Sequence, residues 1–241
     1  MLSISQKKKV TSLKQKKFRT TFNSFVIEGV KMVEELLLSD YEVEEIYATA
    51  DWAQDNSEID CIEVSEKELG QISSLKTPNK VLAVVQQKEA VITGFSFKLT
   101  LALDKLQDPG NMGTIIRTSD WFGIDTIVCS EDSVDIYNPK VIQATMGSFF
   151  RVSIVYVNLS EFFISNEDLT VYGALLDGDN VYQKKLNNKG AVLLMGNESK
   201  GISDKLLPFV TERVLIPNFG KAESLNVATA TAILCSEFVR T

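Results

Sequence analysis

Three polar segments, each directly after an apolar stretch, contain the side chains best suited to chemistry. Amide, carboxylate, hydroxyl and guanidinium groups can orient a polar ligand and stabilise charge that develops on it. Glycines in the same segments let a ligand approach the backbone closely. The segments are DPGNMGTIIRT (108–118), LLMGNESKGIS (193–203) and IPNFGKAESLNVATATAI (216–233), and their candidate residues are Asn111, Arg117, Glu198, Ser224 and Asn226.

Taken singly, each segment also has a plain structural interpretation. Asn111 and Ser224 are residue types that cap helices, and Glu198 is typical of an exposed turn. A helix expected over 113–122 places Arg117 four residues in, where it can face the same ligand as Asn111 or simply solvent. What favours a shared function is the recurrence of the pattern in three segments.

The helix after Leu225 is apolar on nearly every face, so we expect it to be buried. Its first turn nevertheless follows a polar run. Unpaired N–H groups at the start of a helix attract ligands, which predicts a polar binding site at this point.

Alternating strands and helices predict two α/β domains. A helix over 24–38, strands at 43–49, 61–64 and 81–87 and a short helix between the last two form a small first domain. The second has a parallel sheet with its loops at the strand ends, where such sheets bind ligands. Its expected elements are a strand at 99–106, helices at 113–122 and near 138–147, strands at 125–130, 152–157, 170–176, 191–196 and 213–217, and the closing helix. We divide the chain into 1–88, a linker at 89–97, and 98–241.

Composition excludes several functional classes. The chain of 241 residues has no histidine, which removes Ser-His-Asp and Cys-His catalysis and most transition-metal sites. Its three cysteines are far apart and form no CxxC pair, as is typical of reduced thiols in a cytoplasmic protein. No apolar run is long enough to span a bilayer, and the basic start lacks the apolar stretch of a secretory signal.

Charge is distributed unevenly along the chain, whose net charge is −7. No acidic residue precedes Glu28, whereas seven basic residues do. Such a basic arm can hold a phosphate backbone, or it can be a solvated tail, and charge alone leaves both open. These residues are Lys7, Lys8, Lys9, Lys14, Lys16, Lys17 and Arg19.

The three segments, in this order, resemble the motifs of the SpoU (TrmH-like) RNA 2′-O-ribose methyltransferases of the SPOUT superfamily. Residues 137–154 resemble the intermediate segment of that family, and FVIEGVKMVEELL (25–37) resembles the start of the L30e-like RNA-binding domain that precedes many members. The resemblance covers nearly the whole chain.

The resemblance implies an α/β catalytic domain with a C-terminal trefoil knot, acting as a homodimer on RNA with S-adenosylmethionine as cofactor. Asn111, Arg117, Glu198, Ser224 and Asn226 would surround the ribose. Met195, Gly196, Ile216 and Leu225 would hold the cofactor, largely through backbone groups. The added first domain favours ribosomal over transfer RNA, and dependence on a 2′-hydroxyl excludes DNA.

The chain departs from the family pattern at three positions: Asn218 where Met is frequent, Ala228 where Ser is common, and Gln143 where Arg is frequent. Gln143 weakens the case for a phosphate contact there. Family proposals let Arg117 activate the hydroxyl. A guanidinium stays protonated, however, so we favour a clamp that stabilises alkoxide charge while water takes the proton.

Two other functional classes agree less well with the sequence. A dinucleotide-dependent enzyme on a Rossmann sheet would need G-x-G-x-x-G after the first strand, and this chain has DPGNMG after Leu103 instead. A non-enzymatic RNA-binding relic of the methyltransferase fold would not need all five ribose-site residues together. Turnover distinguishes the two, because a relic would bind RNA but release no S-adenosylhomocysteine.

Overall fold

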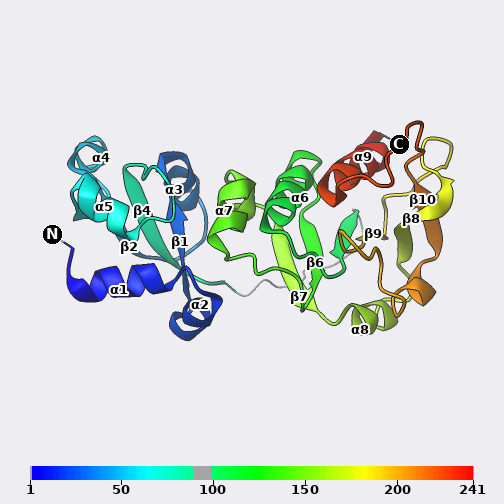
Figure 1. Cartoon of the computed structure of the whole chain (residues 1–241), viewed down its shortest axis with the longest axis horizontal. Helices are drawn as coiled ribbons and strands as arrows, with labels where there is room; N and C mark the ends of the chain where they lie inside the picture. Colours follow the sequence, from blue (N-terminus) through cyan, green and yellow to red (C-terminus); the bar gives the residue numbers. More distant parts are fainter. Residues whose placement is uncertain (1, 89–98, 241) are drawn as a thin grey trace. The chain divides into compact units, whose positions relative to one another are not determined.

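The computed structural model describes residues 2–88 and 99–240, and these form two compact units, each with its own sheet (Figure 1). The first unit comprises residues 2–88 together with Asp135–Phe150, and the second comprises the rest. The expected linker, 89–97, lies outside the described residues. No helix of the described parts is long and apolar enough to cross a membrane.

The first unit is built on a mixed four-stranded sheet in the order β1-β4-β2-β3. Strand β4 is antiparallel to both β1 and β2, and β2 is parallel to β3. The strands predicted near 43–49, 61–64 and 81–87 and the helix between the last two are confirmed. The elements are α1 (Ile4–Ser12), α2 (Lys16–Phe22), β1 (Ser24–Glu28), α3 (Val30–Leu37), β2 (Val43–Ala48), α4 (Ala50–Asp55), β3 (Ile62–Glu63), α5 (Glu66–Ile72), β4 (Val81–Gln86), α7 (Pro139–Thr145) and the 3-10 helix η1 (Ser148–Phe150).

The prediction of one helix over 24–38 is wrong at its start, because Ser24–Glu28 forms β1. All of this strand but its last residue is buried, and a strand buried on both faces shows no polar alternation. Its apolar residues therefore also matched helical spacing. Gly29 separates β1 from α3 with a φ of +98°, a conformation that glycine adopts readily.

Residues 135–150 pack into the first unit through aromatic rings. The ring of Phe25 on β1 lies 4.6 Å from that of Tyr137 and 5.7 Å from that of Phe149, centroid to centroid. The Tyr137 hydroxyl donates to the Lys88 carbonyl at 2.7 Å and accepts from the Lys88 N–H at 2.9 Å. The contacts place this segment in the core of the first unit, although sequence neighbours on both sides belong to the second.

A buried ion pair fixes the same segment. The Arg19 side chain is only 3% exposed, and its Nη2 lies 2.6 Å from Oδ2 of Asp135. Nη1 donates to the carbonyls of Leu13 and Lys14 at 2.9 and 3.0 Å. A buried guanidinium is tolerated only when it is paired and hydrogen-bonded in this way.

The second unit is a six-stranded parallel sheet in the order β10-β8-β9-β5-β6-β7. Helices α6 and α9 pack against each other, and α8 contacts β6 (Figure 1). The central strands β5 and β9 are wholly buried, as the sequence predicted. The elements are β5 (Thr100–Leu103), α6 (Pro109–Trp121), β6 (Thr126–Ser130), β7 (Ser153–Val157), α8 (Leu159–Ile164), β8 (Thr170–Asn180), β9 (Ala191–Met195), the 3-10 helix η2 (Leu207–Phe209), β10 (Glu212–Leu215) and α9 (Val227–Arg240).

Candidate active site

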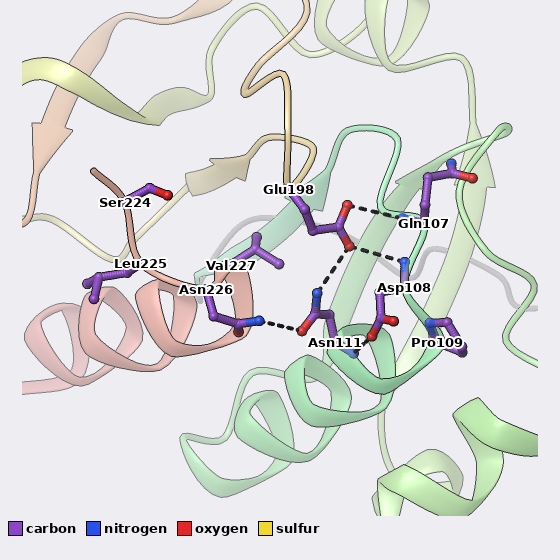
Figure 2. Close-up of a pocket in the computed structure, with 9 residues that line it drawn as sticks. All are labelled: Gln107, Asp108, Pro109, Asn111, Glu198, Ser224, Leu225, Asn226 and Val227. Carbon is purple, nitrogen blue, oxygen red and sulfur yellow. Dashed lines mark hydrogen bonds between the residues drawn. The ribbon is translucent and has the colours of Figure 1, made fainter. Parts of the chain in front are cut away.

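Three segments of the second unit that are far apart in the sequence meet in one pocket of about 760 Å³ (Figure 2). They are the loop after β5, the loop after β9 and the chain that enters α9. The first two follow strands of the parallel sheet, so the pocket lies at the carboxyl ends of the strands, where open sheets bind ligands. It is lined by Gln107, Asp108, Pro109, Asn111, Glu198, Ser224, Leu225, Asn226 and Val227.

Asn111 sits in the first turn of α6, because the helix begins at Pro109 and not near Gly113 as expected. Asp108 caps the helix, and its side chain accepts from the Asn111 N–H at 2.8 Å. Proline suits the first helical position, where no N–H is needed. The amide side chain of Asn111 is thereby aimed into the pocket from a rigid element.

Glu198 accepts four hydrogen bonds and joins the second segment to the first. Its Oε1 accepts from the Asp108 N–H at 3.1 Å and from Asn111 Nδ2 at 3.2 Å. Its Oε2 accepts more weakly from the Gln107 N–H at 3.4 Å and from Asn197 Nδ2 at 3.3 Å. A carboxylate offers about four acceptor positions, so these contacts occupy Glu198 fully. The start of α6 also favours a negative charge at this place.

Asn226 joins the third segment to the same network. Its Nδ2 donates to Oδ1 of Asn111 at 2.9 Å, and its Oδ1 accepts from the N–H groups of Ala228 and Thr229 at 2.9 and 3.2 Å. One side chain therefore caps α9 and orients Asn111 (Figure 2). This geometry accounts for the polar start of an otherwise apolar helix.

The loop after β9 is held in a compact turn by close backbone packing. A Cβ on Gly196 would lie 2.1 Å from the carbonyl carbon of Gly201, so only glycine fits there. Asp104, 1% exposed, anchors the turn from β5: its Oδ2 accepts from the Ser203 N–H at 2.7 Å. Its Oδ1 has no hydrogen-bond partner among the described residues.

Three of the four residues expected to hold the cofactor have backbone groups available for a ligand. Gly196, Ile216 and Leu225 make no backbone–backbone hydrogen bond to another described residue. Backbone groups left open by the fold find a partner in solvent or in a ligand. The carbonyl of Met195, in contrast, accepts from the Asp104 N–H at 2.9 Å, and its side chain is buried.

Arg117 is the one ribose-site candidate that does not line the pocket. It is exposed on α6, six residues beyond Asn111 and therefore about 9 Å along the helix axis on a different face. The earlier start of α6 removes the basis for expecting both side chains to face one ligand within a single chain. Ser224 lines the pocket and is exposed.

The basic residues before Glu28 lie on α1, on α2 and, for Lys14, in the turn between them, and several already make hydrogen bonds or ion pairs. The Lys9 ammonium lies 2.9 Å from Glu44, and although burial opposes it, this carboxylate raises the pKa of Lys9. Lys7 and Lys14 donate to Gln71 Oε1 and the Ser73 carbonyl. Arg19 is buried in its pair with Asp135, so its guanidinium is not a surface group. The remaining lysines, Lys8, Lys16 and Lys17, are exposed.

Sequence reasoning missed Gln107 and Asp108, whose backbone N–H groups hold Glu198. An Asp-Pro pair after a buried strand is itself a signal for a helix start, since Asp caps helices and Pro suits their first position. That signal would have moved the start of α6 to Pro109 and placed these N–H groups at the pocket.

The chain matches two family models in succession, and residues 135–150, which pack into the first unit, fall within the second match. The SpoU rRNA Methylase family model matches residues 98–236, and the MRM3-like substrate binding domain model matches residues 5–83. The chain is 35% identical over 227 residues to the 23S rRNA (guanosine(2553)-2'-O)-methyltransferase RlmP of Bacillus subtilis (strain 168), covering 92% of this chain and 91% of that protein.

Several solved structures match the whole chain, among them the following two. A putative RNA methyltransferase of the TrmH family from Porphyromonas gingivalis is 39% identical with a TM-score of 0.89, covering 100% of this chain and 99% of that chain. The AdoMet-bound rRNA methyltransferase from Sinorhizobium meliloti is 31% identical with a TM-score of 0.88, covering 100% and 97%. The resemblance drawn from the three motifs is confirmed.

Proposed function

The chain belongs to the SpoU rRNA methylase family, and on that premise we propose that it transfers a methyl group from S-adenosylmethionine to a ribose 2′-hydroxyl in ribosomal RNA. The observation that carries the proposal is the hydrogen-bonded series Asn226–Asn111–Glu198, which joins all three motif segments at one pocket. Ribosomal RNA is favoured over transfer RNA because RlmP and the Sinorhizobium meliloti protein are named for rRNA and are matched over both units.

The residues present fit S-adenosylmethionine. Open backbone groups at Gly196, Ile216 and Leu225 would hold it, and Oδ1 of Asp104, which has no hydrogen-bond partner among the described residues, is a buried acceptor in the same region. When bound, the cofactor supplies a methyl group made electrophilic by its sulfonium charge. A C-terminal trefoil knot belongs to the same proposal, and its support is the match of residues 98–236 to the family model.

In this proposal the chain orients the ribose and does not itself take the proton. Glu198 is already occupied by four donors, so it positions Asn111 and is not a free base. Asn111 and Ser224 offer an amide and a hydroxyl to the ribose oxygens. Correct orientation of the 2′-oxygen supplies much of the rate gain, and the proton leaves to water.

Arg117 takes part through the surface it shares with Trp121, four residues further along α6. Trp121 is 84% exposed, which is unusual for so large an apolar side chain. A homodimer formed through the α6–α9 face would cover Trp121 and bring Arg117 to the subunit interface, where it can clamp a phosphate and stabilise alkoxide charge. Sedimentation of Trp121→Arg tests this, and an unchanged sedimentation coefficient contradicts it.

The decisive experiment maps 2′-O-methyl nucleotides by mass spectrometry in total RNA from cells with and without the gene. We expect one ribosomal mark to be lost on deletion, restored by the wild-type gene and not restored by Asn111→Ala or Arg117→Ala. If the methyl mark that is lost lies in transfer RNA, then transfer RNA and not ribosomal RNA is the substrate. If no mark changes in cells that express the protein, the non-enzymatic RNA-binding relic becomes the better explanation.

The cytoplasm is the expected location, given the three cysteines, none in a disulfide.

A further inference from the structure

The short helix α2 presents two phenylalanines and two lysines on the first unit, and we call Lys16, Lys17, Phe18 and Phe22 the α2 surface. The Phe18 and Phe22 rings are nearly parallel, with an angle of 18° between planes and 6.4 Å between centroids. Phe22 is 45% exposed, and Phe18 is partly exposed. The Lys17 ammonium lies 5.9 Å from the centre of the Phe18 ring.

The α2 surface is held rigidly from below and at its end. Arg19, on the same helix, is the residue buried against Asp135 and against the carbonyls of Leu13 and Lys14. Asn23 ends α2 in the left-handed conformation, and its carbonyl accepts from the Gln87 N–H at 2.8 Å. Exposed rings on a fixed support lose little conformational freedom on binding, which favours their use as a contact surface.

Charge indicates what this surface would contact. No acidic residue precedes Glu28, and Lys16 and Lys17 make no ion pair with any described residue, unlike Lys9. A ring with an exposed face beside unpaired ammonium groups complements a chain that carries both flat bases and phosphates. Proteins that bind single-stranded nucleic acid combine aromatic rings with a basic groove in this way.

We propose that the α2 surface binds an unpaired stretch of the substrate RNA, with a base stacked on Phe22 and the neighbouring phosphates on Lys16 and Lys17. This rests on the proposed function, because it assigns a contact for the same RNA. The proposal also gives the basic residues of α2 different roles. Arg19 supports the surface, whereas Lys16 and Lys17 contact the ligand.

The test uses the full chain and a fluorescently labelled single-stranded RNA of mixed sequence, about 12 nucleotides long. Phe22→Leu keeps the apolar volume but removes the flat ring, and we expect it to weaken binding about ten-fold, whereas Phe22→Trp binds at least as well as wild type. Leu38→Ala, at another exposed apolar residue of the first unit, is the matched control and should bind as wild type. The double variant Lys16→Gln/Lys17→Gln should reduce the slope of log affinity against log salt by about 1.4.

A second readout separates this inference from the proposed function. With ribosomal RNA as substrate, Phe22→Leu should raise KM and leave kcat unchanged. Wild-type binding by Phe22→Leu overturns the inference, as does a change in its sedimentation coefficient, which would mean that a second copy of the chain covers the surface. If the wild-type protein transfers no methyl group but Phe22→Leu still loses RNA binding, the inference stands and the proposed function fails.

Discussion

The pocket of the second unit and the α2 surface of the first are built in opposite ways. The pocket depends on hydrogen bonds between residues as far apart in sequence as Asn111 and Asn226, whereas the α2 surface lies within one helix of seven residues. Residues in one network do not contribute independently, but well-separated side chains do. We therefore expect pocket substitutions to be strongly coupled and α2 substitutions to be nearly additive.

The largest effect is expected where the pocket depends on backbone packing alone. Gly196→Ala places a methyl group 2.1 Å from a backbone carbon of the same loop, and this should lower the free energy of unfolding by at least about 4 kcal/mol. Urea unfolding measures the loss. Gly190→Ala is the control, since its Cβ would meet nothing within 4 Å and its left-handed φ should cost only about 1 kcal/mol. Equal losses would mean that close packing does not determine the effect.

The support of the α2 surface should be the next most sensitive point. Asp135→Ala leaves the Arg19 guanidinium buried and unpaired, which should cost about 3 kcal/mol of unfolding free energy. Thermal and urea unfolding check this. Asp177→Ala removes an exposed ion pair with Arg213 and should cost less than about 1 kcal/mol. If both variants unfold alike, the buried pair does not hold α2 in place.

Coupling in the pocket is tested by methyl-transfer kinetics. In Glu198→Gln an amide replaces a carboxylate that accepts four hydrogen bonds, and the amide NH2 then faces other hydrogen-bond donors. We therefore expect kcat/KM to fall roughly 10–100-fold. Adding Asn111→Ala should cost little more, because the first change already releases that side chain. Glu167→Gln, on the surface of the same unit, should leave the rate unchanged. If the losses in kcat/KM caused by the two substitutions are additive, the pocket residues are no more strongly coupled than those of the α2 surface.

The smallest effect is expected in the pH dependence of stability, at a carboxylate that binds the N-terminal residues. The Glu68 carboxylate accepts from the Ser65 N–H and the Leu2 N–H, and these hydrogen bonds lower its pKa to about 2. A lowered folded-state pKa stabilises the fold above the ordinary value of 4.5 and loses that contribution as the pH falls towards 2. The difference in Tm between wild type and Glu68→Gln should therefore shrink between pH 5 and pH 2. A constant difference would contradict the assignment.

The sequence predicts the parallel sheet and the ribose-site segments well, because buried strands and Gly-Asn loops leave strong local patterns. It fails at Ser24–Glu28, where a strand buried on both faces has the same apolar spacing as a helix. The helices α1, α2, α4 and α8 were also not predicted. Each is short, so local propensity is weak and tertiary packing decides.

The candidate site shows a similar limit. Motif positions correctly bring Asn111, Glu198, Ser224, Leu225 and Asn226 to one pocket. The place of Arg117 relative to Asn111 depends on where α6 begins: because the helix starts at Pro109, both residues lie in it, six positions apart and on different faces. The burial of Arg19 depends on Asp135, which lies 116 residues away, and no local pattern carries that information. Roles assigned to the ribose-site, cofactor and RNA residues stay predictions.

The packing of residues 135–150 has a consequence for how the two halves of the gene can be inherited. A recombination event that joined residues 2–88 to the catalytic half of another methylase would give Arg19 a foreign partner and Phe25 foreign rings. A hybrid whose catalytic half lacks an acidic residue to pair with Arg19, or rings to pack on Phe25, would bury an unmatched charge or leave gaps in its core. The first unit of this protein is therefore less easily exchanged by itself than a domain formed from one continuous segment.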